Sequence, residues 1–324
     1  MGTLRARHAV VGASLVATTW LAFYGGWLLL APGGERGLVV FGNTAYLVPI
    51  AAATLLSAWA ATRVPRGLRG YWILLSLACA SWLAGETLWA VAELEWGDVP
   101  FPWWSDAAIY GFYGFALAAL LVYFRPSARA VGAQAILDGI LAIAGLGLLW
   151  WWFVLRDLEL GADLRSLVGL GYPVLDLVLL GTIAATPLLA ARRGAVAGWL
   201  VAGGVAAGGF SDGIYTRMVL DGGYVSGSLV ELGWQLQACL IFVAVVSAHG
   251  IGTETNWTQR GSPLRVRTAA SMTVALVSVV FVLVVDGVAA SLEPDTVLVA
   301  CVVAGLLLVR GWLLLLAAQR ESAR

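Results

Sequence analysis

Ten runs of mostly apolar residues follow one another along the chain, separated by short polar connections. A helix needs about 20 such residues to cross the hydrocarbon core of a bilayer. The pattern therefore predicts an all-α, multi-pass membrane protein that forms a single transmembrane domain over residues 1–324. The ten expected spans are residues 8–31, 38–61, 71–92, 106–124, 132–155, 167–190, 195–219, 228–248, 269–290 and 296–318.

Arginine marks one side of the expected membrane. The N-terminus, every second loop and the C-terminal tail together hold 14 of the 19 basic residues, all of which are arginines. The opposite side holds Arg36, Arg156, Arg165 and Arg217, and Arg310 lies within the last span. Because cytoplasmic loops are enriched in positive charge, we expect both termini in the cytoplasm and the protein in the plasma membrane.

Composition supports the membrane class and narrows the chemistry. Hydrophobic residues make up 60% of the chain and charged residues 12%, with a mean hydropathy of +0.88. The chain contains no lysine, which excludes a retinal Schiff base and a lysine nucleophile. His8 and His249 lie near expected helix ends and cannot supply paired haem ligands inside the bundle. Cys79, Cys239 and Cys301 stand alone in apolar segments and are interpreted as buried small hydrophobes. We expect no cofactor and no metal site.

Polar positions inside the spans concentrate in a hairpin over residues 82–113. Two helical faces carry them: Trp82, Glu86, Trp89 and Glu93 on the first, and Asp106, Tyr110 and Tyr113 on the second. Spacings of three and four place side chains on one face of a helix. Ionisable side chains at membrane depth are costly and usually face the bundle interior or a water-filled cavity. The hairpin is therefore the first candidate for a site.

A second hairpin, over residues 212–235, has the same pattern. In both hairpins an acid precedes an aromatic or amide side chain by three or four positions: Glu86 and Trp89, Asp106 and Tyr110, Asp212 and Tyr215, Glu231 and Gln235. The match is compatible with a weak parallel repeat of two four-helix units, and chance similarity is the alternative. The nearby Gly204-x-x-x-Gly208 spacing predicts close approach of two helix backbones.

The candidate ligand-binding residues are acids, aromatics and one amide at a similar expected depth: Glu86, Trp89, Asp106, Tyr110, Tyr113, Tyr172, Asp176, Asp212, Tyr215, Glu231 and Gln235. Asp138 is the exception and lies in the inner third of its span. We expect an outward-opening cavity that favours a cationic or proton-donating aromatic ligand, because Trp and Tyr faces attract cations. The alternative is that each acid only joins helices through hydrogen bonds, which contribute about 0.6 kcal/mol on average inside membranes.

Several short motifs carry a family resemblance. They are Gly85-Glu86-Thr-Leu-Trp89, Pro100-Phe-Pro-Trp-Trp-Ser-Asp106-Ala-Ala-Ile-Tyr110, Leu137-Asp138-Gly-Ile, Tyr172-Pro173-Val-Leu-Asp176-Leu and Ser211-Asp212-Gly-Ile-Tyr215. With them, residues 71–250 resemble the polytopic N-terminal sensor region of actinobacterial GGDEF and EAL proteins, which act in cyclic-di-GMP signalling. The chain departs from that family because it has no GGDEF, EAL or kinase signature. The resemblance implies a sensor region whose catalytic domain is fused elsewhere or belongs to a partner.

The leading hypothesis is a membrane-embedded signal-input module. A small ligand would bind in the acidic and aromatic pocket, and the helix of residues 296–318, which runs into a helix-compatible tail, would pass the signal to a fused or partner cytoplasmic domain. The alternatives are a secondary transporter or proton-coupled carrier and a structural membrane partner. No catalytic motif is present, so an enzymatic role for this chain has no positive support. Expected partners are the lipid bilayer, an unidentified small ligand and a cytoplasmic signalling domain, without nucleic acid; a homodimer stays open.

Overall fold

The computed structural model describes residues 2–64, 66–97, 99–124, 133–156, 161–184, 195–220, 222–250, 272–273, 275–280, 282 and 294–322. Within these residues every regular element is a helix, and eight helical stretches are long and apolar enough to cross a membrane. The expected all-α, multi-pass membrane class is therefore confirmed. The expected span at 269–290 lies mostly outside the described residues.

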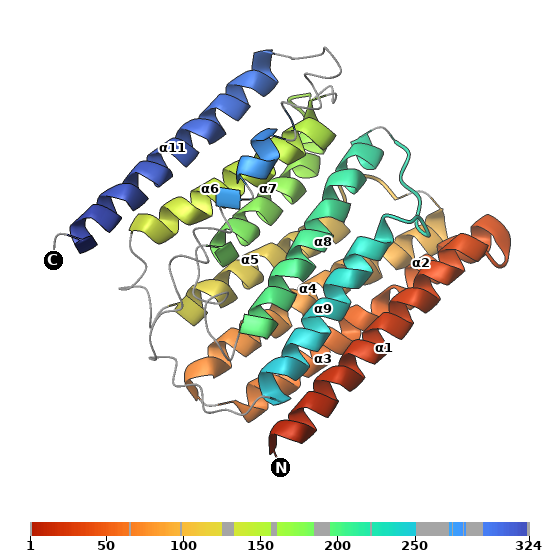
Figure 1. The fold of residues 1–324 in the computed structure, drawn as a ribbon. Helices are drawn as coiled ribbons and strands as arrows, with labels where there is room; N and C mark the ends of the chain where they lie inside the picture. Colours follow the sequence, from red (N-terminus) through yellow and green to blue (C-terminus); the bar gives the residue numbers. More distant parts are fainter. Residues whose placement is uncertain are drawn as a thin grey trace.

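The helices are α1 (Gly2–Leu30), α2 (Gly34–Ala45), α3 (Leu47–Arg63), α4 (Arg66–Trp96), α5 (Trp104–Phe124), α6 (Ala133–Trp150), α7 (Leu164–Ala184), α8 (Ala195–Leu220), α9 (Glu231–Gly250) and α11 (Pro294–Ser322). They lie side by side along one common direction, and α6 continues through one π-helical stretch at Trp151–Leu155 (Figure 1). Helix α1 begins and α11 ends at the same end of the bundle, which we call the proximal end (Figure 1). The opposite end, which holds the loop of residues 222–230, is the distal end.

The expected span 38–61 is confirmed within one candidate membrane span, Gly34–Arg63, but this span is interrupted at Tyr46, where α2 ends at Ala45 and α3 begins at Leu47. Pro49 explains the break. A proline has no N–H to donate to the carbonyl four residues earlier, and its ring clashes with that carbonyl. The carbonyl in question belongs to Ala45, the last residue of α2. The break places Tyr46 between the two helices, where its side chain is buried beside α4.

Pro173 lies inside α7, and unlike the segment before Pro49 this helix continues without a break. The carbonyl that it leaves without an intrahelical partner belongs to Gly169. Thr216 Oγ1 of α8 donates a hydrogen bond to that carbonyl at 3.0 Å. A neighbouring helix thus satisfies the freed backbone group, as membrane-spanning helices with internal prolines require.

The two polar hairpins, α4 with α5 and α8 with α9, pack closely through glycine. A methyl group at Gly85 of α4 would lie 2.8 Å from the carbonyl oxygen of Ser105, and one at Gly204 of α8 would lie 3.2 Å from the carbonyl oxygen of Gln237. The distance at Gly85 is shorter than real side chains show, and the distance at Gly204 is tighter than most of them. The expected close approach at Gly204 and Gly208 is confirmed, since both positions face Gln237 of α9.

The hairpins also contact their neighbours in matching ways. Tyr110 Oη of α5 donates to the carbonyl of Val168 in α7 at 2.5 Å, and Gln235 Nε2 of α9 donates to the carbonyl of Tyr46 before α3 at 3.1 Å. Tyr110 and Gln235 occupy corresponding positions in the proposed repeat. Each of these two side chains bonds the second helix of its own hairpin to a backbone carbonyl of the other four-helix unit. The matching contacts favour the repeat, and a common origin of the two halves stays a prediction.

Candidate functional site

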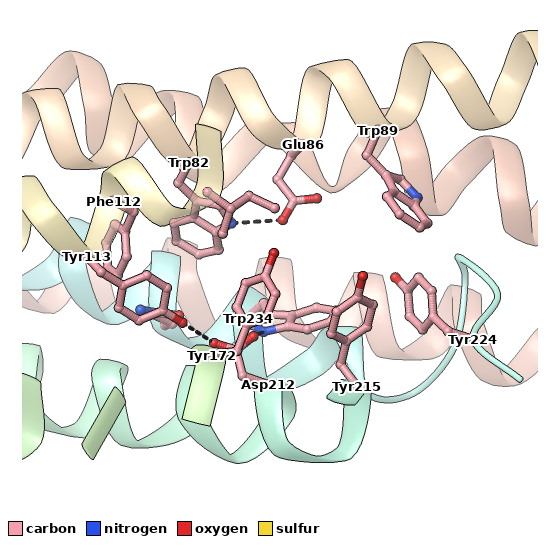
Figure 2. A pocket seen from close by; sticks show the side chains of 12 residues that line it. Trp82, Glu86, Trp89, Phe112, Tyr113, Tyr172, Asp212, Tyr215, Tyr224 and Trp234 are labelled. Carbon is pink, nitrogen blue, oxygen red and sulfur yellow. Dashed lines mark hydrogen bonds between the residues drawn. The ribbon is translucent and has the colours of Figure 1, made fainter. Parts of the chain in front are cut away.

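A small cavity lies between α4, α5, α7, α8 and α9, with the loop of residues 222–230 beside it (Figure 2). Its lining consists of eight aromatic side chains, two acids, one amide and one aliphatic residue: Trp82, Glu86, Trp89, Ile109, Phe112, Tyr113, Tyr172, Asp212, Tyr215, Tyr224, Trp234 and Gln237. The centres of water-sized molecules have about 50 Å³ available inside it. Since one water needs roughly 10–15 Å³ on this measure, the cavity suits a very small ligand or a small head group.

Glu86 is the cavity acid that keeps an oxygen for a ligand. Its Oε1 accepts hydrogen bonds from Trp82 Nε1 at 2.9 Å and from Tyr46 Oη at 3.3 Å. No residue that the structure describes donates a hydrogen bond to Oε2, and the side chain is only partly buried. Figure 2 shows the carboxylate directed into the space between Trp82 and Trp89. A cationic group in that space would contact Oε2 directly.

Asp212, on the facing helix α8, is fully engaged by protein donors. Trp234 Nε1 donates to Oδ1 at 2.7 Å, and Tyr113 Oη donates to Oδ2 at 2.6 Å. Asp176 of α7 lies next to Asp212 behind the cavity wall, and its buried Oδ2 has no hydrogen-bond partner among the described residues. Asp212 therefore organises the wall of the cavity and has little capacity left for a ligand.

The distal wall is a cluster of aromatic rings in edge-on contact. Tyr215 and Tyr224 have ring centroids 4.8 Å apart at 84°, and Tyr215 meets Trp234 at 5.6 Å and 70°. Trp89 meets Tyr224 at 5.8 Å and 64°. Such tilted pairs are favourable beyond their buried area. Burial raises the pKa of the Tyr224 phenol well above its ordinary value, and the nearby Glu231 carboxylate adds to that effect, so the phenol stays neutral.

Two acids hold the loop of residues 222–230 against the distal end of the bundle. Glu93 Oε2 accepts from Asn43 Nδ2 at 2.6 Å and from Trp89 Nε1 at 3.2 Å, and Glu93 Oε1 accepts from the Ser226 backbone N–H at 3.5 Å. Trp89 Nε1 also lies 3.2 Å from Ser226 Oγ. Glu231 Oε1 accepts from the Gly227 N–H at 2.5 Å. These contacts fix the loop that carries Tyr224 into the cavity.

The cavity contains six of the eleven sequence-predicted site residues, and two of the remaining five lie at its edge. Those in the lining are Glu86, Trp89, Tyr113, Tyr172, Asp212 and Tyr215. Asp106 instead accepts from the Trp103 N–H at 2.6 Å and from Tyr172 Oη at 2.5 Å, so it holds the start of α5 and positions a lining tyrosine. Asp176 lies behind Asp212.

Tyr110, Glu231 and Gln235 are outside the cavity, contrary to the sequence-based expectation. Tyr110 bonds the backbone of α7. Glu231 accepts a short hydrogen bond from Tyr24 of α1, and Gln235 Oε1 accepts from Trp20 Nε1 at 2.7 Å. The face of α9 that carries Glu231 and Gln235 is therefore directed to α1 and α3, because α1 packs along α9. Their role is to join helices.

Several lining residues were not among the candidates. Trp82 shares a helical face with Glu86, and that spacing was a usable signal. Trp234 and Gln237 follow Glu231 on α9, on the side of the helix next to the Glu231 and Gln235 face that the repeat suggested. Tyr224 lies in a loop, where no periodic pattern predicts the direction of a side chain. Phe112 and Ile109 are ordinary apolar positions of α5.

Asp138, the expected outlier, has a partner that sequence reasoning did not assign. Arg310 Nε of α11 lies 2.8 Å from Asp138 Oδ1 of α6, and both side chains are 0% exposed. The pair lies between α6 and α11, away from the cavity lining. Arg310 was recognised as an arginine within the last span, but its acid partner is far away in the sequence.

No family model, curated protein or solved structure matches the chain in the comparisons. Among the residues that the structure describes, no three His, Cys, Asp or Glu side chains are grouped as metal ligands would be. The chemistry of the site therefore rests on its own geometry. One carboxylate oxygen faces a small space walled by aromatic rings, and the lining from the described residues includes no arginine.

Proposed function

We propose that the protein is a membrane-embedded ligand-binding module that serves as a signal input. The observation that carries the proposal is Glu86, whose Oε2 faces an aromatic cavity without an internal donor. A carboxylate in such a place is stabilised when a cation fills the space beside it. The ligand is therefore a small cation, and the helices around the cavity are the elements whose arrangement it biases.

The orientation belongs to the same proposal. The arginine-rich loops place both termini in the cytoplasm, and the cavity near the distal end then lies toward the outer face. Cysteine substitutions at Gly97 and Gly261 test this arrangement with a membrane-impermeant thiol reagent. Labelling of the two positions from opposite sides is expected, and labelling of both from the same side contradicts the orientation.

Helix α11 supports an output at the proximal end. It is continuous over 29 residues from Pro294 to Ser322, which corresponds to about 43 Å at 1.5 Å per residue. The hydrocarbon core of a bilayer is only about 30 Å thick. The last turns of α11 therefore extend past the membrane, where a fused or docked signalling domain would receive a shift of the helix. The resemblance to sensor regions of cyclic-di-GMP signalling proteins agrees with this role.

The carrier alternative needs a polar path that reaches the proximal side. Asp138 was the acid that offered such a path, and its pairing with Arg310 makes it unsuited to bind a passing ion or proton. The sensor role is therefore preferred. A flux measurement separates the two roles, because a sensor binds its ligand without moving it across a vesicle membrane.

Binding is tested with the full chain in lipid nanodiscs. A library of small cations, anions and neutral compounds is screened by the shift of the thermal unfolding midpoint and by intrinsic tryptophan fluorescence. We expect cations to produce the shifts and Glu86→Gln to remove them. Glu95→Gln is the matched control, because Glu95 is an exposed acid on the same helix. Shifts by anions alone, or equal shifts in both variants, would contradict a cation site at Glu86.

A further inference from the structure

The class of cation that fits the cavity can be specified further, and this step rests on the proposed binding function. The donors and acceptors that remain free in the lining decide which class fits. Five donors of lining residues already bind protein acceptors: Trp82 Nε1 to Glu86, Trp89 Nε1 to Glu93, Trp234 Nε1 to Asp212, Tyr113 Oη to Asp212 and Tyr172 Oη to Asp106. These five donors are therefore not available to a ligand.

Within the described ranges, three groups of the lining are left for a ligand, and each of them can accept a hydrogen bond. Glu86 Oε2 accepts no bond from the described residues, and Tyr215 Oη and the Gln237 amide also make no hydrogen bond within the part of the chain that the structure describes. Figure 2 shows the Tyr215 hydroxyl directed toward the same space as the Glu86 carboxylate. A carboxylate oxygen accepts only, while a phenol and an amide can do both. At Glu86 Oε2 a complementary ligand must therefore bring an N–H or O–H donor.

Size and charge restrict the ligand further. About 50 Å³ for the centres of water-sized molecules corresponds to roughly three to five water-sized groups. The rings of Trp89 and Tyr224 beside Glu86 favour a positive charge over their faces. Ca²⁺ takes about six to eight oxygen ligands, whereas the free oxygens named above in the lining are Glu86 Oε2, Tyr215 Oη and the Gln237 carbonyl.

We propose that the cavity binds a short-chain primary ammonium, with its N–H groups on Glu86 Oε2 and Tyr215 Oη and its alkyl part against the aromatic wall. A quaternary ammonium carries the same charge and would gain the same contact with the rings, but it has no N–H for either oxygen. The geometry therefore predicts a preference for primary over quaternary ammonium. An anion has no cationic side chain to bind among the lining residues.

The test is a titration of the full chain in nanodiscs, followed by tryptophan fluorescence and calorimetry. The probes are methylammonium, ethylammonium, tetramethylammonium and acetate. We expect ethylammonium or methylammonium to bind at least about tenfold more tightly than tetramethylammonium, because a hydrogen bond to a charged group contributes about a factor of ten or more. Glu86→Gln should weaken both classes of ammonium, and Glu95→Gln should change neither.

Tyr215→Phe separates the N–H contribution from the charge. It removes only the hydroxyl and keeps the ring, so it should weaken primary ammonium binding by about threefold to tenfold and leave tetramethylammonium unchanged. Equal or tighter binding of tetramethylammonium overturns the primary-ammonium assignment but leaves a cation site intact. No binding of any ammonium to protein that still shows its cooperative unfolding transition also overturns the assignment, and the broader library screen then decides the proposed function independently.

Discussion

Asp138 and Glu86 are both acids on membrane-spanning helices, but their surroundings differ in kind. Asp138 is closed off by Arg310 at 2.8 Å, and neither side chain has any exposure. Glu86 receives two neutral donors on one oxygen and has the other oxygen facing a cavity. One acid is fully compensated by the fold. The other is compensated in part, and it keeps one oxygen that a ligand can approach.

The comparison separates two uses of a charge inside a membrane protein. Intramembrane ionisable residues are costly, and they pair with one another or face a cavity. The ion pair between α6 and α11 joins two helices and has no accessible surface to offer. The cavity between α4 and α8 has an oxygen and several aromatic faces available. Under the proposed function, helix attachment and ligand binding thus belong to different parts of the bundle.

The largest expected effect comes from breaking the closed pair. Arg310→Leu removes the guanidinium that contacts the buried Asp138 carboxylate, and removing one partner of a buried ion pair costs about 3–5 kcal/mol. We expect a large loss of thermal stability in nanodiscs. The double variant Asp138→Asn with Arg310→Leu should recover most of the loss, because neither member of this pair then carries a buried charge. Equal stability of the single and double variants would show that the pair is not the source of the effect.

A smaller loss is expected at the second cavity acid. Asp212→Asn replaces one of two accepting oxygens by an NH₂ group, so either Trp234 Nε1 or Tyr113 Oη loses its acceptor. A buried donor left without a partner costs about 1–3 kcal/mol. The free energy of unfolding in denaturant measures the loss, with Glu95→Gln as the exposed control. An unchanged unfolding free energy would mean that the two donors find other acceptors, and the wall of the cavity would then be less fixed than described.

A local rather than global effect is expected at the loop of residues 222–230. Glu93→Gln keeps the shape of the side chain but removes its charge, which weakens its bonds with Ser226 and Asn43. Each bond contributes about 0.5–1.5 kcal/mol net. Hydrogen–deuterium exchange should therefore accelerate in this loop while the exchange of α6 and α11 stays the same. Uniform acceleration over the whole chain would contradict a local role.

Sequence reasoning succeeded where the relevant distance along the chain is short. The bonds of Trp82 with Glu86 and of Trp89 with Glu93 link residues four positions apart on one helix. Helical periodicity alone places such side chains on a common face. The lengths of the apolar runs likewise predicted most of the helices. The interruption before Pro49 was missed, although the missing donor of a proline is a local signal.

Contacts between distant parts of the chain could not be derived in this way. Arg310 and Asp138 are 172 positions apart, and Tyr24 and Glu231 are 207 apart. Periodicity gives the face of each helix but not the neighbour that the face meets. Whether the Glu231 side chain faces the cavity or α1 depends on how α1 packs along α9. That packing is a property of the whole bundle and has no signature in the hairpin itself.

The smallest effect is expected at Asp163, an acid outside the membrane-spanning segments. Asp163 precedes α7, and its Oδ1 accepts from the Ser166 backbone N–H at 2.9 Å. Hydrogen bonds from the Ser166 hydroxyl and backbone lower the pKa of the Asp163 carboxyl below its usual value. This acid is satisfied by an N-terminal cap of a helix, and it is fully exposed to water.

Because the folded-state pKa of Asp163 is lowered, its contribution to stability is present above the unfolded-state pKa of about 3.9 and is lost as the pH falls through the folded-state value. We therefore expect a slight drop in the thermal midpoint on acidification below about pH 4. Asp163→Asn, which still offers a capping oxygen, should abolish that component of the drop while the midpoint at neutral pH stays nearly the same. The same variant should leave ammonium binding unaltered, since Asp163 has no contact with the cavity lining. If Asp163→Asn shifted the binding curve, the cap of α7 would be coupled to the cavity, most directly through Tyr172 on the same helix, and the separation between structural and ligand-facing acids would have to be redrawn.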